Sequence, residues 1–499
     1  MRTISKWVVG WVLASCLACG VSAYGYTEPE EADYFAVFLE GKKVGHAIQT
    51  RIIADGKVTS TEKVRLSINR VGVPVTLDMS ETAIETGDGN PLGFESTQHF
   101  SMMMVVIKGQ VRPNGTMEVV TQSMGAEQKT EPNWPAGAIM CEGLRLLSLQ
   151  KGLAEGTQYK ALVFVPSLMQ AVMAEVVVGP KLEIDVLGST EVLTEVKTTL
   201  SVPSVGRMST TSYVDDLQRA RKTLMPLAGM QFEMIHCTQA FALTSIDPVE
   251  FIDKMLVRSP VALENLAKVA SITYLLRPKD PGTALVIPQA DTQTVRKLED
   301  GKIEVTVTPT EPKAGAAYPY RGNDPDVLAA LRPNAYLQSE DNAIVQLARQ
   351  AVGDANDAAE AAGRIEAFVA GYIHHKDLSV GYASAAEVAK NKQGDCTEHA
   401  VLCAALCRAV GIPAKVVTGL AYVPEFAGVR TCFGGHAWTA AYVGGGWIGL
   451  DAAFKGTGRG GYDAGHIALA IGDGEPGDFF GIATTLGRFT IQEATVNPQ

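Results

Sequence analysis

The stretch GDCTEHAVLCAALCRAVGIPA, residues 394–414, decides how the C-terminal part of the chain folds. No helix-breaking residue follows Cys396 until Gly411, and Pro413 comes directly afterwards. This pattern predicts a helix that begins near Cys396 and ends before Gly411. Alanine, leucine and cysteine dominate the run, which indicates that the helix is buried on most sides. The sequence therefore predicts a core helix with a cysteine in its first turn.

The position of Cys396 favours a chemical role. The first turn of a helix has unpaired N–H groups and the positive end of the dipole, which together stabilise an anion. The thiolate anion is the reactive form of cysteine. Cys403 and Cys407 lie deeper in the same helix, lack this advantage and are interpreted as small packing residues. Cys396 is therefore the candidate nucleophile.

A nucleophilic cysteine needs a base, and the segment CFGGHAWTAAYVGGGWIGLDAAF, residues 432–454, contains a candidate. The segment is typical of two strands joined around three glycines. His436 lies on the first strand and Asp451 lies on the second. A carboxylate that holds an imidazole in the right tautomer, with the imidazole facing a nucleophile, is the arrangement of a catalytic triad.

The strand pairing decides whether His436 and Asp451 can meet. If Gly444 and Gly445 form a two-residue turn, Asp451 pairs with Trp438 and is a diagonal neighbour of His436 on the same face. If Val443 and Gly444 form the turn, Asp451 faces His436 directly. A three-residue turn would place the two residues on opposite faces unless a bulge intervened. Both two-residue turns therefore permit the triad.

These motifs together resemble the core of the transglutaminase-like superfamily, in the family's order and at compatible spacings. The motifs are Gly394-Asp395-Cys396, the run from Leu406 to Ala414, Gly435-His436-Ala437-Trp438, Trp447 to Asp451, and HIALAIGDG at 466–474. The resemblance covers the region 335–499. It implies a papain-like α+β core with Cys396 as nucleophile, His436 as base and Asp451 as the residue that orients the base.

The resemblance also implies a reaction class. Members of the superfamily share attack by a thiolate on a carboxamide carbonyl, which gives a thioester that water or an amine resolves. The backbone N–H of Cys396 is expected to stabilise the oxyanion, with the side chain of Gln393 or Tyr372 as a second candidate donor and Trp438 as a supporting residue. No acidic loop resembles the calcium sites of animal transglutaminases, and no cysteine or histidine spacing matches a zinc site, so we expect no cofactor and no metal.

The chain before this core predicts an antiparallel β-rich region, so the fold class is α+β. Residues 27–245 show alternating β-branched residues between turn pairs such as Asp55-Gly56, which favours a sandwich or an open barrel. The proline-rich stretch 246–333 is interpreted as a connecting β module with edge strands. Helices are predicted to begin in the catalytic domain, residues 334–499.

Residues 1–23 are typical of an export signal, because Arg2 and Lys6 precede a short apolar run. Leu13-Ala14-Ser15-Cys16 resembles a bacterial lipobox, which would make Cys16 the site of lipid attachment and membrane tethering. Cleavage after Ala23 is the alternative. Both predict a periplasmic protein whose cysteines face an oxidising environment, where Cys432 could pair with a helix cysteine.

Composition limits the function classes. The formal net charge of −11, from 43 basic and 54 acidic residues, argues against nucleic-acid binding. We therefore predict an exported thiol enzyme, a peptidase or amidase-type hydrolase or an acyltransferase, acting on protein, peptide or cell-wall peptide amides. The alternative is a catalytically silent domain of the same fold, used for binding or as an envelope scaffold.

Overall fold

The structure is a computed structural model, and the residues described are 31–70, 73–100, 103–123, 126–202, 206–227, 230–246, 249–250, 256–279, 285–375, 383–474 and 488–498. The chain divides after Glu250 into two compact units, each of which is described by itself. The predicted export signal and Cys16 lie outside the described residues. None of the described helices combines the length and the apolar character that crossing a membrane requires.

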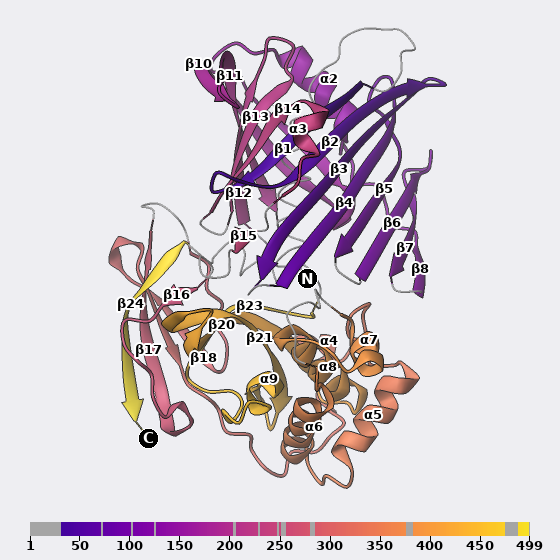
Figure 1. The fold of residues 1–499 in the computed structure, drawn as a ribbon. Helices are drawn as coiled ribbons and strands as arrows, with labels where there is room; N and C mark the ends of the chain where they lie inside the picture. Colours follow the sequence, from indigo (N-terminus) through magenta and orange to yellow (C-terminus); the bar gives the residue numbers. More distant parts are fainter. Residues whose placement is uncertain are drawn as a thin grey trace. The chain divides into compact units, whose positions relative to one another are not determined.

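The N-terminal unit is built on one large antiparallel sheet (Figure 1). Among the described residues its strands follow the order β8-β7-β6-β5-β4-β3-β2-β1-β14-β13-β12-β11-β10-β9, and β15 pairs with β3 in parallel. The elements of this unit are β1 Glu31–Leu39, β2 Lys42–Ala54, β3 Lys57–Arg70, β4 Val73–Thr86, β5 Pro91–Phe100, β6 Met103–Val111, β7 Met117–Ser123, β8 Ala126–Thr130, α2 Cys141–Lys151, β9 Gln158–Val165, η1 Pro166–Leu168, β10 Gln170–Val186, β11 Ser189–Val202, β12 Gly206–Val214, β13 Ala220–Leu227, β14 Met230–Cys237, α3 Gln239–Ala242 and β15 Val249–Glu250.

Sequence alternation and turn chemistry explain this sheet. Asp55 and Gly56, with φ angles of 51° and 70°, join β2 to β3 in the tight turn that the sequence predicts. The inner face carries apolar residues that pack across the unit, where Phe164 on β9 contacts Phe94 on β5 with ring centroids 5.1 Å apart. The predicted antiparallel β-rich region is therefore confirmed.

The C-terminal unit is α+β, as predicted (Figure 1). A core sheet has the order β16-β21-β20-β23 with β22 paired to β21, and a second sheet has the order β18-β19-β17-β24. The elements are β16 Val257–Arg258, η3 Leu266–Lys268, β17 Val269–Pro278, β18 Gln293–Lys297, η4 Glu299–Gly301, β19 Ile303–Val307, α4 Pro325–Ala329, α5 Asn342–Val352, α6 Ala358–Tyr372, α7 Ala385–Asn391, α8 Cys396–Ala409, β20 Ala414–Phe426, β21 Val429–Val443, β22 Gly446–Leu450, α9 Ala452–Lys455, β23 His466–Gly472 and β24 Phe489–Pro498.

Helix α8 is the predicted core helix. It begins at Cys396 and ends at Ala409, with Val410 as its C-cap and Gly411 as the next residue. Every residue from Glu398 to Arg408 is buried. The helix contacts β20 and β21 of the core sheet and is surrounded by α5, α6, α7 and α9. The apolar content of the run 394–414 is thus explained by its central place in the unit.

The stretch 246–333, interpreted from sequence as a connecting module, supplies part of this unit. Strands β17 and β19 pair with each other, and β24 from the end of the chain pairs with β17. The ring of Tyr274 on β17 packs edge-on against Phe433 of β21, and its hydroxyl donates a hydrogen bond to the Ala464 carbonyl at 2.8 Å. The second sheet therefore shares a core with the first and supports the loop that precedes β23.

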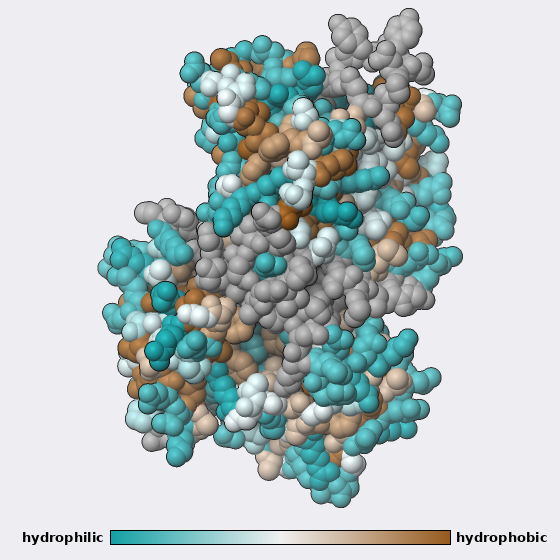
Figure 2. Space-filling model, in the orientation of Figure 1, coloured by the Kyte–Doolittle hydropathy of each residue, from teal (hydrophilic) through white to brown (hydrophobic). Residues whose placement is uncertain are grey.

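The outer helices are amphipathic. In α5 the residues Ile344, Ala348, Ala351 and Val352 are buried and form an apolar stripe at helical spacing. Figure 2 shows mainly hydrophilic side chains on the visible face of the helical part of the unit. Helix α5 contacts the core helix α8.

Candidate active site

The first turn of α8 is fixed by a reciprocal capping arrangement. Asp395 Oδ1 accepts a hydrogen bond from the Thr397 N–H at 3.0 Å, and Glu398 Oε2 accepts one from the Asp395 N–H at 2.9 Å. Glu398 Oε1 also accepts from the Ala383 N–H at 2.9 Å. This capping box holds the half-buried Cys396 at the first helical position. The Asp-x-x-Glu spacing was present in the sequence but was not used in our prediction.

Gly394 is required by this arrangement. Its φ angle is +152°, and a Cβ atom at this position would lie 2.3 Å from Cβ of Glu398. We expect Gly394→Ala to lower the free energy of unfolding by about 2 kcal/mol, because the backbone is strained and the capping glutamate must move. Urea denaturation measures this loss. The matched control is Gly371→Ala in α6, where an added Cβ meets no atom within 4 Å and stability should not fall. Equal stabilities for the two variants would contradict the assignment.

The β21–β22 hairpin brings His436 and Asp451 together. Val443 pairs with Gly446, so Gly444 and Gly445 form the turn, with φ angles of 62° and 89°. The sequence left two favourable registers open, and the structure has the first of them. Strand β22 ends one residue earlier, so Asp451 follows it as the N-cap of α9. Asp451 thus caps α9 and also contacts the imidazole of His436.

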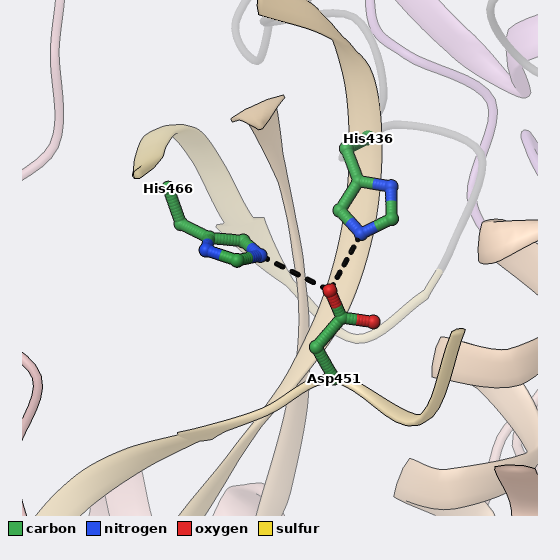
Figure 3. A group of neighbouring side chains, drawn as sticks. All are labelled: His436, Asp451 and His466. Atoms are coloured by element: carbon green, nitrogen blue, oxygen red, sulfur yellow. Dashed lines mark hydrogen bonds and ion pairs between the residues drawn. The ribbon is translucent and has the colours of Figure 1, made fainter. Parts of the chain in front are cut away.

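Asp451 holds the imidazole of His436 directly (Figure 3). Its Oδ2 atom lies 2.8 Å from Nε2 of His436. Oδ1 accepts a hydrogen bond from the Phe454 N–H at 3.0 Å, and the Asp451 N–H donates to Oε1 of Glu366 at 2.7 Å. Asp451 is only 1% exposed. The carboxylate is therefore fixed at both oxygens, and His436 keeps Nδ1 for a partner on its other side.

The electrostatics favour a charged His436. Burial lowers the pKa of His436, but the charge of Asp451, the charge of a Cys396 thiolate and hydrogen bonds to both outweigh burial and raise that pKa to about 9. Burial likewise opposes the charge on Asp451, yet His436 and His466 hold the pKa of that carboxyl well below its usual range. The arrangement can therefore store a proton on His436 while Cys396 is a thiolate.

Aromatic rings fix the plane of His436. Phe454 stacks on the imidazole with ring centroids 4.3 Å apart and an interplanar angle of 20°. Trp438, expected from sequence as a supporting residue, is buried on the same strand with its ring 6.3 Å from that of His436. Phe454 was not identified from the sequence, because its contact depends on the short helix that follows Asp451.

A second histidine, His466, also contacts Asp451 (Figure 3). Its Nε2 atom lies 3.0 Å from Asp451 Oδ2, the oxygen that His436 uses. His466 is the first residue of β23 and is fully buried. The sequence placed it on a strand after the aspartate but gave it no role. Its position depends on the pairing of β23 with β20, which no local motif reveals.

His436, Asp451 and His466 are also a group whose ligand atoms lie within 4.8 Å of one another, a spacing at which a metal could be considered. Hydrogen bonds account for these atoms. Asp451 Oδ2 lies at hydrogen-bond distance from both imidazoles, and each imidazole has a further partner at its other nitrogen. The contacts of this group are those of a hydrogen-bonded cluster.

The remaining candidates surround the start of α8. The Tyr372 hydroxyl donates a hydrogen bond to the Ala389 carbonyl at 2.6 Å, so in this arrangement its proton is directed to the backbone. Gln393 is half-buried three residues before Cys396, and its role as an oxyanion donor stays a prediction. The six described cysteines are all free thiols, so Cys432, which is fully buried, is not paired with a helix cysteine.

The two histidines give the stability of this unit a defined pH dependence. Hydrogen bonds to Asp451 and Asp463 overcome burial and raise the pKa of His466 to about 9, like that of His436. A group with a raised folded pKa contributes stability that is complete below the unfolded pKa of about 6.5 and is lost as pH rises through the folded value. The carboxyl groups of Asp451 and Asp463 have lowered pKa values, so their contribution is lost only as pH falls below about 4.

We therefore expect the free energy of unfolding of the C-terminal unit to be largest between about pH 4 and 6.5. It should fall by about 3 kcal/mol between pH 6.5 and 9, since the two histidines share one carboxylate oxygen. Urea denaturation at fixed pH values measures this. A His436→Gln variant, which has one titrating group fewer, should show a smaller fall. A flat profile in the native protein over this range would contradict the prediction.

Comparison with known proteins supports the class of domain. Residues 345–452 match the model of the transglutaminase-like superfamily, so the chain contains a transglutaminase-like domain. This stretch includes Cys396, His436 and Asp451. No curated protein matches the chain.

Three solved structures show limited likeness. A candidate cysteine protease from Cytophaga hutchinsonii is 20% identical, with 46% of this chain and 84% of that chain covered and a TM-score of 0.29. A β-barrel-like protein of a domain of unknown function from Brucella abortus is 13% identical, with 42% and 96% covered and a TM-score of 0.32. A candidate protease from Parabacteroides distasonis is 12% identical, with 80% and 69% covered and a TM-score of 0.18.

Proposed function

We propose that the C-terminal unit is a thiol enzyme that cleaves or transfers amide-linked acyl groups through Cys396. The observation that carries the proposal is the His436 imidazole, which Asp451 holds at 2.8 Å and whose raised pKa depends in part on a hydrogen bond to Cys396. The half-buried position of Cys396 at a capped helix start supports it, because a thiolate is stabilised there. The match of this region to the transglutaminase-like superfamily supports the same reaction class.

The proposed reaction has two steps. The Cys396 thiolate attacks the amide carbonyl carbon, the carbon–nitrogen bond breaks, and His436 gives its proton to the leaving amine. A water molecule or a second amine then attacks the thioester carbon and gives a proton to His436. The Cys396 sulfur leaves as a thiolate, and the acyl group departs as a carboxylic acid or a new amide. Asp451 keeps His436 in the required tautomer and orientation in both steps.

We propose hydrolysis as the main outcome, because water is always available. The proposed substrates are peptide, protein or cell-wall peptide amides, since the N-terminal sequence is typical of an exported protein. In this proposal the protein acts in the periplasm and is tethered by lipid on Cys16.

A substrate-independent experiment tests the proposal. The full chain is incubated with a complex peptide library in water enriched in ¹⁸O, with and without hydroxylamine. Hydrolysis through a thioester places one ¹⁸O atom in each new carboxyl group, and hydroxylamine should convert part of these products into hydroxamates. Mass spectrometry detects both products. The binding-domain alternative would be favoured if neither product formed from peptide or cell-wall fragment libraries, while the protein was folded and the Cys396 thiol did not react near neutral pH.

A further inference from the structure

His466 has an acidic partner at each of its two ring nitrogens. Its Nε2 atom lies 3.0 Å from Oδ2 of Asp451 (Figure 3). Its Nδ1 atom lies 3.0 Å from Oδ1 of Asp463 and 3.0 Å from the backbone oxygen of the same residue. Carboxylate and carbonyl oxygens only accept hydrogen bonds, so each nitrogen of His466 must carry a proton to satisfy them. The geometry is that of an imidazolium.

One contact argues for the other protonation state. The Asp463 N–H approaches Nδ1 of His466 at 3.3 Å, which would require that nitrogen to accept. The two oxygen contacts at 3.0 Å are shorter, and one of them is to a carboxylate, so they outweigh it. His466 is fully buried, and a buried positive charge is tolerated only beside opposite charges, which Asp451 and Asp463 supply.

The other ionisable groups around this cluster leave that charge balanced. Arg459 binds Asp463 through two contacts of 3.0 and 3.2 Å, and Lys455 of α9 pairs with Glu366 of α6 at 2.6 Å, while Glu366 also receives the Asp451 N–H. Tyr462 packs its ring 4.8 Å from that of His466, and Tyr274 of β17 directs its hydroxyl to the Ala464 carbonyl. With His466 charged, Asp451, Asp463 and Glu366 face the cations His466, Arg459 and Lys455. A charged His436 is then the counterion of the Cys396 thiolate.

We propose that His466 is a positioning residue, a protonated imidazolium that shares the Asp451 carboxylate with His436 and thereby sets the pH range in which His436 holds and releases its proton. The inference rests on the proposed function and adds a regulator to the same site. The two imidazole rings are 5.7 Å apart, so a positive charge on His466 favours release of the proton from His436.

This tuning has a purpose in the proposed reaction. His436 must give its proton to the leaving amine, and a histidine bound by Asp451 alone would hold that proton too strongly. Because Oδ2 is shared with His466, the carboxylate stabilises the positive charge of His436 less strongly, while its hydrogen bond still orients the His436 ring. Oδ1 of Asp451 accepts a hydrogen bond from the Phe454 N–H. This bond keeps the carboxylate from rotating, so Oδ2 stays shared between the two histidines.

Nitrogen-15 NMR of histidine-labelled full-length protein tests the charge state directly. We expect both ring nitrogens of His466 to be protonated from pH 5 to about 8, and these signals to vanish in His466→Gln. In the same variant, the titration of His436 should move up by about one pH unit, because a nearby positive charge is removed while a hydrogen-bond donor is kept. His236→Gln in the N-terminal unit is the matched control, since His236 also faces a carboxylate, that of Asp33 at 3.4 Å, and should leave both readouts unchanged.

The outcomes separate the possibilities. One protonated and one unprotonated nitrogen on His466 near pH 6.5 would overturn the proposal, as would an unmoved His436 titration in His466→Gln. If His466 had only a structural role, His466→Gln would lower the alkylation rate of Cys396 at all pH values without moving the His436 titration. If His466→Gln fails to fold, glutamine variants of the other seven of the eight histidines assign the His466 signals by elimination. A peptide library that is not cleaved, with His466 doubly protonated and coupled to His436, would reject the proposed function alone.

Discussion

Replacing Cys396 with alanine is expected to abolish ¹⁸O incorporation and hydroxamate formation from the peptide library. The thioester cannot form without the sulfur atom, so the rate should fall at least about 10⁴-fold, to the level of the uncatalysed reaction. The fold should be unaffected, because Cys396 is half-buried at a helix start that Asp395 and Glu398 cap through other atoms. Mass spectrometry of the library products measures the first effect, and circular dichroism measures the second.

The matched control for this prediction is Cys141→Ala. Cys141 is also half-buried and is also the first residue of a helix, α2, in the N-terminal unit. It should retain full activity, which would show that the loss belongs to Cys396 and not to the removal of any thiol. Amide cleavage that survives in Cys396→Ala at more than a hundredth of the native rate would refute the nucleophile assignment.

Asp451→Asn is expected to have the second largest effect. The substitution keeps the size of the side chain but removes the negative charge that lies 2.8 Å from His436 and 3.0 Å from His466. His436 then loses its orientation and much of its tendency to hold a proton, so the cleavage rate should fall about 10³–10⁴-fold. The loss should appear in kcat more than in KM, because the residue does not contact the substrate.

Asp354→Asn provides the comparison for that change. Asp354 is 94% exposed and pairs with Arg364 on the surface of the same unit, so its substitution should leave the rate within about twofold of native. If Asp451→Asn and Asp354→Asn had similar activities, Asp451 would have no part in orienting the base.

The local features of the C-terminal unit could be predicted because short-range chemistry decides them. The extent of α8 follows from the absence of helix-breaking residues between Cys396 and Gly411, with Pro413 beyond it. The sequence left two registers open for the hairpin, and the structure has the one in which Gly444 and Gly445 form the turn. Given that register, the meeting of His436 and Asp451 is a geometric consequence of two-residue periodicity. The antiparallel sheet of the N-terminal unit was equally predictable from its alternating strands and tight turns.

The features that were missed depend on contacts between distant segments. His466 reaches Asp451 only because β23 pairs with β20, and Glu366 reaches the Asp451 N–H from α6, 85 residues earlier. Neither contact has a sequence signature, since a buried histidine on a strand is ordinarily a packing residue. The role of 246–333 in the core of the C-terminal unit was hidden for the same reason, because β17 pairs with β24 at the end of the chain.

The most direct test of the central claim is the rate of alkylation of Cys396 by iodoacetamide from pH 4 to 10, followed by peptide mass spectrometry. Native protein and His436→Ala are compared, and Cys141 in the same samples controls for a helix start without the histidine. We predict that Cys396 reacts faster than Cys141 in the native protein, and that His436→Ala slows the reaction of Cys396 about 100-fold. A Cys396 that reacts only at alkaline pH, and equally in both proteins, would contradict a Cys396–His436 pair.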